Sequence, residues 1–209
     1  MAASIERVVT SGTFSLDGQD FDVDNNVWLV GDDREVLVVD AAHDARAVLA
    51  AVGDRSVVAI ACTHGHNDHV NAAVEVASAT GAPVLINPED RHLWDVAHPD
   101  RAPDGDLVDG AELTVAGLTL RVLATPGHSW GSVSLHVPEL TAVLTGDTLF
   151  QGGPGATGRS FSDFPTIIAS IRDRLLALPA ETVVHTGHGD TTTIGAEAPH
   201  LQEWIDRGH

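Results

Sequence analysis

The segment THGHNDH, residues 63–69, concentrates side chains that bind metal ions. Its three imidazoles and one carboxylate belong to His64, His66, His69 and Asp68. Neutral imidazole and carboxylate groups are good ligands for zinc and other first-row divalent metals. Gly65 would ease a sharp turn, so that alternating side chains aim at two neighbouring points. The segment therefore predicts a metal site; the alternative is a polar loop with incidental histidines in a chain that has 12 of them.

Three further segments place a ligand-type residue in a glycine-containing turn. They are ATPGHSWGS (124–132) with His128, LTGDTLF (144–150) with Asp147, and VVHTGHGD (183–190) with His188. Each turn follows a predicted strand, and α/β proteins place their ligands at the carboxyl ends of strands. With the first segment they supply seven candidate ligands, which is too many for one tetrahedral zinc ion and suits two metal ions that share a ligand.

The elements that position the first segment alternate between strands and helices. Strands are predicted over 27–30, 35–40, 57–62 and 83–87, and helices over 44–53 and 71–81. This βαβ rhythm predicts a sheet covered by helices. The histidine-rich segment lies between the strand that ends at Cys62 and the helix that begins near Val70.

The second half of the chain has a different pattern. Residues 88–106 are polar and contain three prolines, which predicts a helical turn and a surface loop. Four strands separated by turns, typical of an antiparallel meander, are then predicted over 112–115, 118–125, 132–137 and 141–146. A helix with one apolar face is predicted over 164–179, followed by a strand over 181–187 and a short helix over about 196–206. No linker interrupts the order, so we expect one domain over 1–209.

Composition restricts the partners of this protein. The formal charge is −19, and an acidic chain repels nucleic-acid phosphates and anionic membrane surfaces. The single cysteine, Cys62, allows no intramolecular disulfide. No segment approaches the length of a membrane span, and the N-terminus lacks the apolar core of a signal peptide. We therefore expect a cytoplasmic protein that binds neither nucleic acid nor membrane; its oligomeric state is left open.

Taken in order, THGHNDH, PGHS, GDTLF and GHG resemble the motifs of the metallo-β-lactamase-fold hydrolase superfamily. They are most similar to its glyoxalase II group, the hydroxyacylglutathione hydrolases, and the match runs through essentially the whole chain. The resemblance implies an α/β (α+β) fold, a four-layer αββα sandwich with a dinuclear site at one edge. It implies a first metal on His64, His66 and His128, a second on Asp68, His69 and His188, and Asp147 as the bridge. Zinc is the first expectation, with iron and manganese as alternatives.

Several branches of the superfamily do not suit this sequence. Class B1 β-lactamases have a cysteine ligand near the position of Asp147, and diiron oxygen reductases have glutamate at the position of His66. The nuclease branch carries a large inserted domain, and acyl-homoserine lactonases use a tyrosine, which this chain lacks. A thioester hydrolase remains. The alternatives are a persulfide dioxygenase with one iron on the equivalents of His64, His128 and Asp147, and a metal-binding protein without turnover.

The glyoxalase II resemblance implies that a hydroxide bridging the two metals attacks the thioester carbonyl. One metal would stabilise the oxyanion and the other the leaving thiolate, while Asp68, the expected catalytic residue, would orient the hydroxide. The expected partner is a small-molecule acyl-thiol substrate. The family binds glutathione through lysine, tyrosine and a helical C-terminal extension, whereas this chain has neither residue and ends 21 residues after His188. We therefore expect a short form, for which mycothiol or coenzyme A is as open as glutathione.

Two residues are predicted to contact the substrate. Arg159 is the only cation of the glycine-rich segment 151–164 and would pair with a substrate carboxylate; a surface ion pair is the alternative. Trp130 would line the pocket or pack under its turn. The segment around Trp94 is interpreted as a lid.

Asp40, at the end of a predicted strand, is expected to hydrogen-bond the metal-binding loop without touching a metal, or else to cap a helix. The histidines without a motif position are interpreted as structural or exposed; they are His43, His92, His98, His136, His185, His200 and His209.

Overall fold

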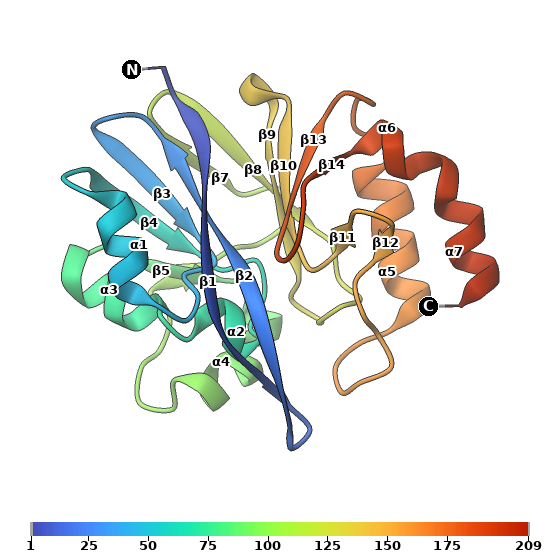
Figure 1. Cartoon of the computed structure of the whole chain (residues 1–209), viewed down its shortest axis with the longest axis horizontal. Helices are drawn as coiled ribbons and strands as arrows, with labels where there is room; N and C mark the ends of the chain where they lie inside the picture. The colour runs from blue at the N-terminus through green and yellow to red at the C-terminus, as the bar shows by residue number, and fades with distance from the viewer. Residues whose placement is uncertain (1, 209) are drawn as a thin grey trace.

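Two six-stranded sheets face each other between outer helices in the computed structural model, which describes residues 2–208 (Figure 1). The first sheet has the strands in chain order: β1 (Ser4–Leu16), β2 (Gln19–Gly31), β3 (Glu35–Val39), β4 (Ser56–Ala61), β5 (Val84–Ile86) and β6 (Gly105–Asp106). Strands β1 to β3 pair antiparallel, and β3 to β6 pair parallel.

The second sheet is mostly antiparallel and contains the predicted meander. Its spatial order is β14 (Thr192–Thr193), β13 (Val183–Thr186), β10 (Ala142–Gly146), β9 (Val133–Val137), β8 (Leu118–Ala124) and β7 (Glu112–Val115). Strands β10 and β13 pair parallel, and the other neighbours are antiparallel. A two-stranded ribbon, β11 (Leu149–Phe150) and β12 (Gly153–Pro154), follows β10.

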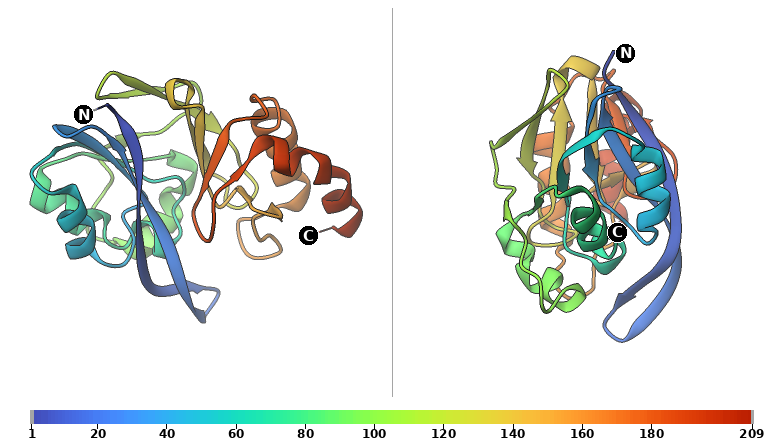
Figure 2. Two further views of the ribbon diagram at one scale, coloured as in Figure 1. Left: turned by 45° about the horizontal axis from the view of Figure 1, so that its top comes forward. Right: turned by 90° about the vertical axis from the view of Figure 1, so that its left-hand side faces the viewer.

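Helices cover the outer face of each sheet, as two views of the ribbon make plain (Figure 2). On the first sheet lie α1 (Ala45–Val52), α2 (Asn67–Val70), α3 (Ala73–Thr80), the 3₁₀ turn η1 (Pro88–Asp90) and α4 (Arg91–Ala97). On the second lie α5 (Phe164–Ser170), its π-helical continuation η3 (Ile171–Leu175), α6 (Ile194–Glu197), η4 (Ala198–His200) and α7 (Leu201–Arg207). A further 3₁₀ turn, η2 (Pro138–Leu140), joins β9 to β10.

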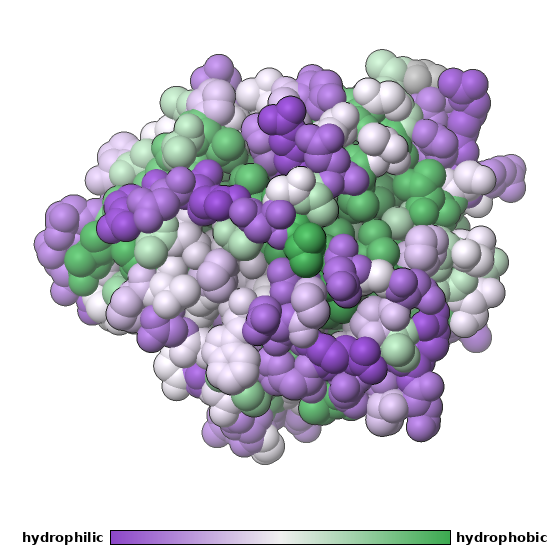
Figure 3. Space-filling view, turned by 180° about the vertical axis from the view of Figure 1, so that it is seen from behind, coloured by the Kyte–Doolittle hydropathy of each residue, from purple (hydrophilic) through white to green (hydrophobic). Residues whose placement is uncertain are grey.

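Three apolar clusters hold these four layers together. Because successive strand residues point to opposite faces, β3 buries Val36 and Val38 under the helices and Leu37 and Val39 against the second sheet. The third cluster, including Ile167, lies between the second sheet and its helices. The expected αββα sandwich is therefore confirmed. On the face seen from behind, hydrophobic side chains show in patches between hydrophilic ones (Figure 3).

Local sequence signals account for several helix boundaries. Asp44 caps α1 by accepting hydrogen bonds from the backbone N–H groups of Arg46 and Ala47, and Gly53 ends it with φ of 63°. Asp163 caps α5 in the same way through Thr166. No helix among the described residues is long and apolar enough to cross a membrane.

The structure differs from the sequence-based expectation in four places. The predicted strand 27–30 is the end of a much longer hairpin, since β1 and β2 pair along 13 positions. The predicted helix 71–81 is confirmed as α3, but an additional short helix, α2, precedes it and lies inside the histidine-rich segment and at Val70. The predicted helix 164–179 ends in a π turn at Leu175. Trp94, which lies in a segment whose sequence is polar, is fully buried in the apolar cluster under the first sheet, and the interpretation of its segment as a lid stays a prediction.

His185, on β13, gives the fold a pH dependence. Burial lowers the pKa of His185 to about 4, and its ring packs against Trp28 at 4.5 Å between centroids. A histidine that is neutral when folded but has an unfolded pKa near 6.5 supports folding fully above about pH 6.5, and this support is lost as pH falls toward 4. We expect protonation of His185 in the unfolded chain to lower the unfolding free energy of the wild type by about 2 kcal/mol between pH 7 and pH 5.

Urea unfolding at both pH values, with His185→Asn and the exposed His200→Asn as control, checks this prediction. The His185→Asn variant should lose less stability on acidification than the wild type, and the control should follow the wild type. Equal losses in His185→Asn and wild type would contradict it.

Candidate metal centre

The histidine-rich segment leaves the end of β4 and turns into α2, which carries its ligand-type side chains inward. His64, His66, Asp68 and His69 are each less than 5% exposed. His64 and His66 lie on the turn, whereas Asp68 and His69 lie on α2. We call residues 63–69 the histidine loop.

The other three candidate ligands come from the ends of three strands of the second sheet. His128 follows β8, Asp147 follows β10, and His188 follows β13. All three side chains are buried or largely buried, with exposed fractions of 9%, 11% and 25%. The carboxyl ends of four strands from two sheets therefore meet at one edge of the sandwich, as the sequence predicted.

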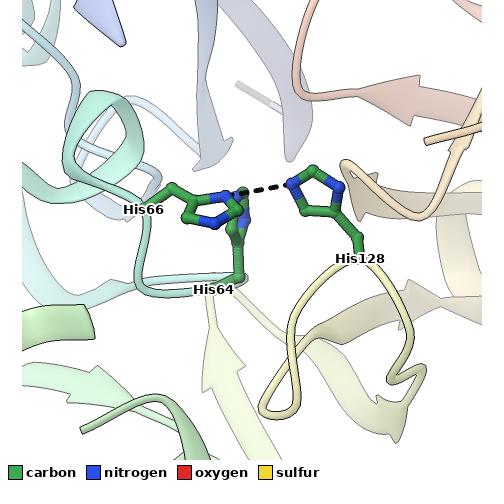
Figure 4. A group of neighbouring side chains, drawn as sticks. All are labelled: His64, His66 and His128. Carbon is green, nitrogen blue, oxygen red and sulfur yellow. Dashed lines mark hydrogen bonds between the residues drawn. The ribbon is translucent and has the colours of Figure 1, made fainter. Parts of the chain in front are cut away.

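His64, His66 and His128 form a first group of candidate ligands. One ring nitrogen from each lies within 4.8 Å of the others, and the three rings pack edge to face (Figure 4). The Nδ1 atom of His66 is 3.0 Å from Nε2 of His128. Two ring nitrogens at this distance face a common point, which suits a shared cation.

Asp68, His69 and His188 form a second group under the same 4.8 Å limit. The Nε2 atoms of His69 and His188 are 3.2 Å apart, and each lies 3.4–3.5 Å from Oδ2 of Asp68. Asp147 stands between the two groups. Its Oδ1 is 3.4 Å from His69 Nε2, and its Oδ2 is 3.5 Å from His128 Nε2 and 3.4 Å from His188 Nε2.

The buried polar atoms of this cluster fit metal ions. Four of them have no hydrogen-bond partner among the described residues: Nε2 of His64, Nε2 of His66, Oδ1 of Asp68 and Oδ1 of Asp147. Buried polar atoms without partners are rare because each costs free energy, and a bound cation would satisfy them. The His and Asp side chains are thus positioned to bind metal ions, and their donor atoms suit first-row divalent metals.

The electrostatics of the two groups differ. Burial, together with the neighbouring His69 and His66, holds the pKa of His64 well below its usual range, and burial lowers the pKa of His66 to about 3. These rings are neutral and ready to donate a lone pair. Burial opposes protonation of His188, but the carboxylates of Asp147 and Asp68 raise its pKa to about 10, so a metal in the second group would displace a proton.

Asp40 holds the histidine loop from behind. It ends β3 in a left-handed conformation, with φ of 55°, and accepts hydrogen bonds from the N–H and Oγ1 of Thr63, both at 2.7 Å. Its Oδ2 also lies 3.0 Å from Nδ1 of His69, which aims Nε2 of that ring at the second group. Both oxygens of Asp40 are thus engaged. The helix-cap alternative is wrong, because Asp44 caps α1.

Asp90 is a buried carboxylate that sequence reasoning missed. Its Oδ2 accepts hydrogen bonds from Gly65 N at 2.8 Å and Ser129 Oγ at 2.6 Å, and its Oδ1 accepts one from Gly131 N at 2.6 Å. Asp90 therefore ties the histidine loop to the turn that carries His128. The only signal in the sequence is an acidic residue in a polar segment, which ordinarily indicates solvent exposure.

Asn25 is a second buried residue of the site that the sequence analysis did not predict. It is fully buried on β2, and its Nδ2 lies 3.1 Å from Oδ2 of Asp68 and 3.2 Å from Nε2 of His69. His43 is 2.8 Å from the Oδ1 of Asn25, so this histidine supports the site without joining either group. Among the other motif-free histidines that the structure describes, none belongs to a group of candidate ligands; His209 lies outside the described residues.

Gly187 lets the ends of two strands come together at the cluster. A Cβ atom at this position would lie 2.1 Å from Oδ1 of Asp147 and 2.8 Å from Cε1 of His69. No side chain fits there, so the glycine of the GHG motif is required by close approach.

The two predicted substrate contacts lie outside the ligand cluster. Arg159 is exposed, donates a hydrogen bond to Oε1 of Gln19 at 3.0 Å and stacks over Phe21 at 5.0 Å. Trp130 is 55% exposed, so the alternative that it packs under its turn is wrong. Its ring instead contacts Phe161, with 5.0 Å between centroids. Their contact with substrate stays a prediction.

Comparison with known proteins agrees with this geometry. The family model described as the metallo-beta-lactamase superfamily matches residues 21–188, and the chain therefore belongs to that superfamily. Within it, the chain is similar to the hydroxyacylglutathione hydrolase GloC of Haemophilus influenzae, at 32% identity over 187 residues, 82% of this chain and 87% of that protein. It is 33% identical to the probable metallo-hydrolase YqgX of Bacillus subtilis over 187 residues, 83% of this chain and 88% of that protein.

Solved structures show the same likeness. A structure of BLEG-1, a B3 metallo-beta-lactamase, has a TM-score of 0.79 and 29% identity, and the match covers 92% of this chain and 98% of that one. TTHA1623 in a di-iron-bound form has a TM-score of 0.76 and 34% identity, over 84% of this chain and 93% of that one. The chain is thus a member of a metallo-hydrolase superfamily with a glyoxalase II-like relative.

Removing the Asp90 carboxylate is expected to loosen the site. Asp90→Ala leaves the buried N–H groups of Gly65 and Gly131 without this acceptor, whereas Ser129 Oγ keeps Ser132 Oγ as a partner. Each buried donor without an acceptor costs about 1–3 kcal/mol. We expect the unfolding free energy to fall by about 3 kcal/mol or more and zinc binding to weaken, as measured by urea unfolding and zinc titration. The neighbouring Glu89→Ala, at an exposed position, is the control. If Asp90→Ala kept wild-type stability and zinc affinity, the proposed role of Asp90 in holding the site together would be contradicted.

Metal loading is expected to be dinuclear. We predict two zinc ions per chain by elemental analysis after dialysis, and a stabilisation of about 2.7 kcal/mol for each ion when free zinc is one hundred times the dissociation constant of that site. His128→Ala should remove the ion of the first group, and His188→Ala that of the second. A single ion in the wild type that is lost in His128→Ala and kept in His188→Ala would indicate a mononuclear site instead.

Proposed function

We propose that this protein is a metal-dependent hydrolase that cleaves a thioester of a small cellular thiol. The observation that carries the proposal is the pair of buried ligand groups with Asp147 between them, which suits two cations rather than one. The similarity to GloC supports thioesters as the substrate class. Bound divalent cations supply Lewis acidity and acidify water at neutral pH.

The protein's own residues would organise the reaction around Asp68. One carboxylate oxygen of Asp68, Oδ2, accepts a hydrogen bond from Asn25, while Oδ1 has no partner. Asn25 therefore fixes the orientation of the carboxylate and leaves one oxygen free to hold and aim a water molecule at the substrate carbonyl. Asp40 fixes His69 beside it in the same way.

A covalent mechanism through the only cysteine does not suit the structure. Cys62 is fully buried in the apolar cluster under the first sheet's helices. Because its side chain is fully buried, it has no access to a substrate. Direct attack by water, positioned by Asp68, is the route that the geometry supports.

The second candidate function is a mononuclear iron persulfide dioxygenase, which would use His64, His128 and Asp147. Against it stands the second group, which is assembled in detail: Asp40 orients His69, and Asn25 orients Asp68. A single metal on the first side would leave these hydrogen bonds without a role.

Thiol release from a panel of acyl thioesters tests the proposal. The panel includes lactoyl-glutathione and acyl derivatives of mycothiol and coenzyme A, with zinc, iron or manganese supplied. We expect metal-dependent release, and a fall in kcat of about 100-fold or more in Asp68→Asn, the usual cost of a group that orients the attacking water. Asp54→Asn, at an exposed turn, is the matched control and should keep wild-type activity.

No thiol release from any thioester, with two metals bound, would overturn the proposal. Oxygen uptake on glutathione persulfide by the iron-loaded protein would then favour the dioxygenase. Inactivity in both assays would favour the non-catalytic alternative.

A further inference from the structure

A pocket of about 360 Å³ opens beside the first ligand group. Its walls come from four segments: the tip of the β1–β2 hairpin, the histidine loop, helix α4, and the loop that precedes α5. Figure 1 shows the hairpin tip reaching beyond the ends of the strands of both sheets. The backbone N–H of Ser160 donates to Oδ2 of Asp17, and Arg159 bonds Gln19, so the loop before α5 and the hairpin tip are in contact.

The surface of the pocket is mainly apolar, although Ser15, Asp17, His66 and Asn67 also line it. Leu16, Leu93, Val96 and Phe161 contribute to its wall. Val96 is 82% exposed and Trp130, whose ring contacts Phe161, is 55% exposed. A cluster of large, solvent-exposed apolar side chains beside a candidate active site indicates a binding site for a ligand that would cover them.

The pocket adjoins the first ligand group of the candidate metal centre at His66. This residue lines the pocket, belongs to the first ligand group, and packs its ring edge against Phe14 at 5.2 Å. A substrate held with its carbonyl between the two ligand groups would therefore place one of its arms in the pocket. The pocket lies on the side of the first group, because no member of the second group lines it.

Charge decides which arm suits the pocket. Among the described residues, Asp17 is the charged residue that lines the pocket, and no lysine or arginine lines it. Arg159, the cation nearest by sequence on the loop before α5, is engaged with Gln19 and Phe21 on the hairpin. An anionic group would meet repulsion and no counter-charge here, whereas an uncharged hydrocarbon arm would bury apolar surface.

The backbone at Phe161 is consistent with a residue placed for binding. Its φ is 68°, in the left-handed region that bulky residues avoid. Strain of this kind is common at ligand clamps, where the surrounding structure holds it. Here it turns the Phe161 ring into the pocket wall and against His92 and Trp130.

We propose that this pocket binds an apolar acyl chain of the substrate, so that the protein prefers unbranched hydrocarbon acyl groups to short hydroxylated ones such as lactoyl. The inference rests on the proposed function for the identity of the reacting group. The occupant is the acyl arm, and the thiol arm leaves on the side of the second group.

Binding can be measured without hydrolysis. Three of the four tryptophans are less than 5% exposed, so Trp130 dominates the solvent-sensitive fluorescence. The probes are straight-chain primary amides from acetamide to octanamide, which carry no charge and no thioester. We expect the dissociation constant to fall about fourfold per methylene until the pocket is full. Trp130→Phe should abolish the fluorescence change, which identifies Trp130 as the reporter; Val96→Asp tests whether the probe binds in this pocket.

Val96→Asp is the discriminating variant. It places a carboxylate in the pocket wall at a position that is 82% exposed, so folding should be preserved. It should remove the dependence on chain length, whereas Val108→Asp, at an exposed valine outside the pocket, should keep it. Equal affinity for all amides in the wild type, or an unchanged dependence in Val96→Asp, would overturn the proposal.

Turnover separates this inference from the proposed function. With acyl groups of two to eight carbons on one thiol, KM should fall with chain length in the wild type and stay level in Val96→Asp. Thiol release without any dependence on acyl length would support the proposed hydrolase activity and contradict the proposal that the pocket binds the acyl chain. Amide binding that depends on chain length, without thiol release from any thioester, would support the acyl-binding pocket and contradict the hydrolase activity. A KM that follows the thiol rather than the acyl group would assign the pocket to the thiol arm and overturn the proposal.

Discussion

Crowding seven imidazole and carboxylate groups into the edge of a sandwich is the constraint on which the rest of this structure depends. Polar groups with no partner are costly in an interior, and several atoms of this cluster have none within the described residues. These unpaired polar groups are concentrated where the carboxyl ends of β4, β8, β10 and β13 converge. Apolar clusters on either side of each sheet supply the stability that lets such a site persist.

Two buried carboxylates that belong to neither the first nor the second ligand group hold the cluster in shape. Asp40, at the end of β3 in the first sheet, accepts hydrogen bonds from the histidine loop and orients His69. Asp90 works between the layers, because it joins Gly65 of the histidine loop to Ser129 and Gly131 beside His128. The relative position of the two halves of the first ligand group therefore depends on a residue that itself binds no metal in our proposal.

The hairpin of β1 and β2 links the metal centre to substrate selection. Its middle contributes Asn25, which contacts Asp68, and its tip contributes Leu16 to the apolar pocket. One continuous element thus orients the proposed catalytic carboxylate and shapes the space beside it. Because the tip extends beyond the sheet and meets the loop before α5, the acyl preference we propose depends on residues 15–18 and Phe161 far more than on the shared metal motifs.

The sequence by itself determined the candidate ligands and the elements that carry them. Short-range signals account for this: strand runs that end in glycine turns, and a histidine motif whose spacing is local. Only the tertiary structure decided that Asp90 and Asn25 are buried against the site, that Trp94 is core, and that Trp130 stands exposed beside an apolar pocket. These properties depend on which distant segments come into contact, and the type and spacing of neighbouring residues do not encode such contacts.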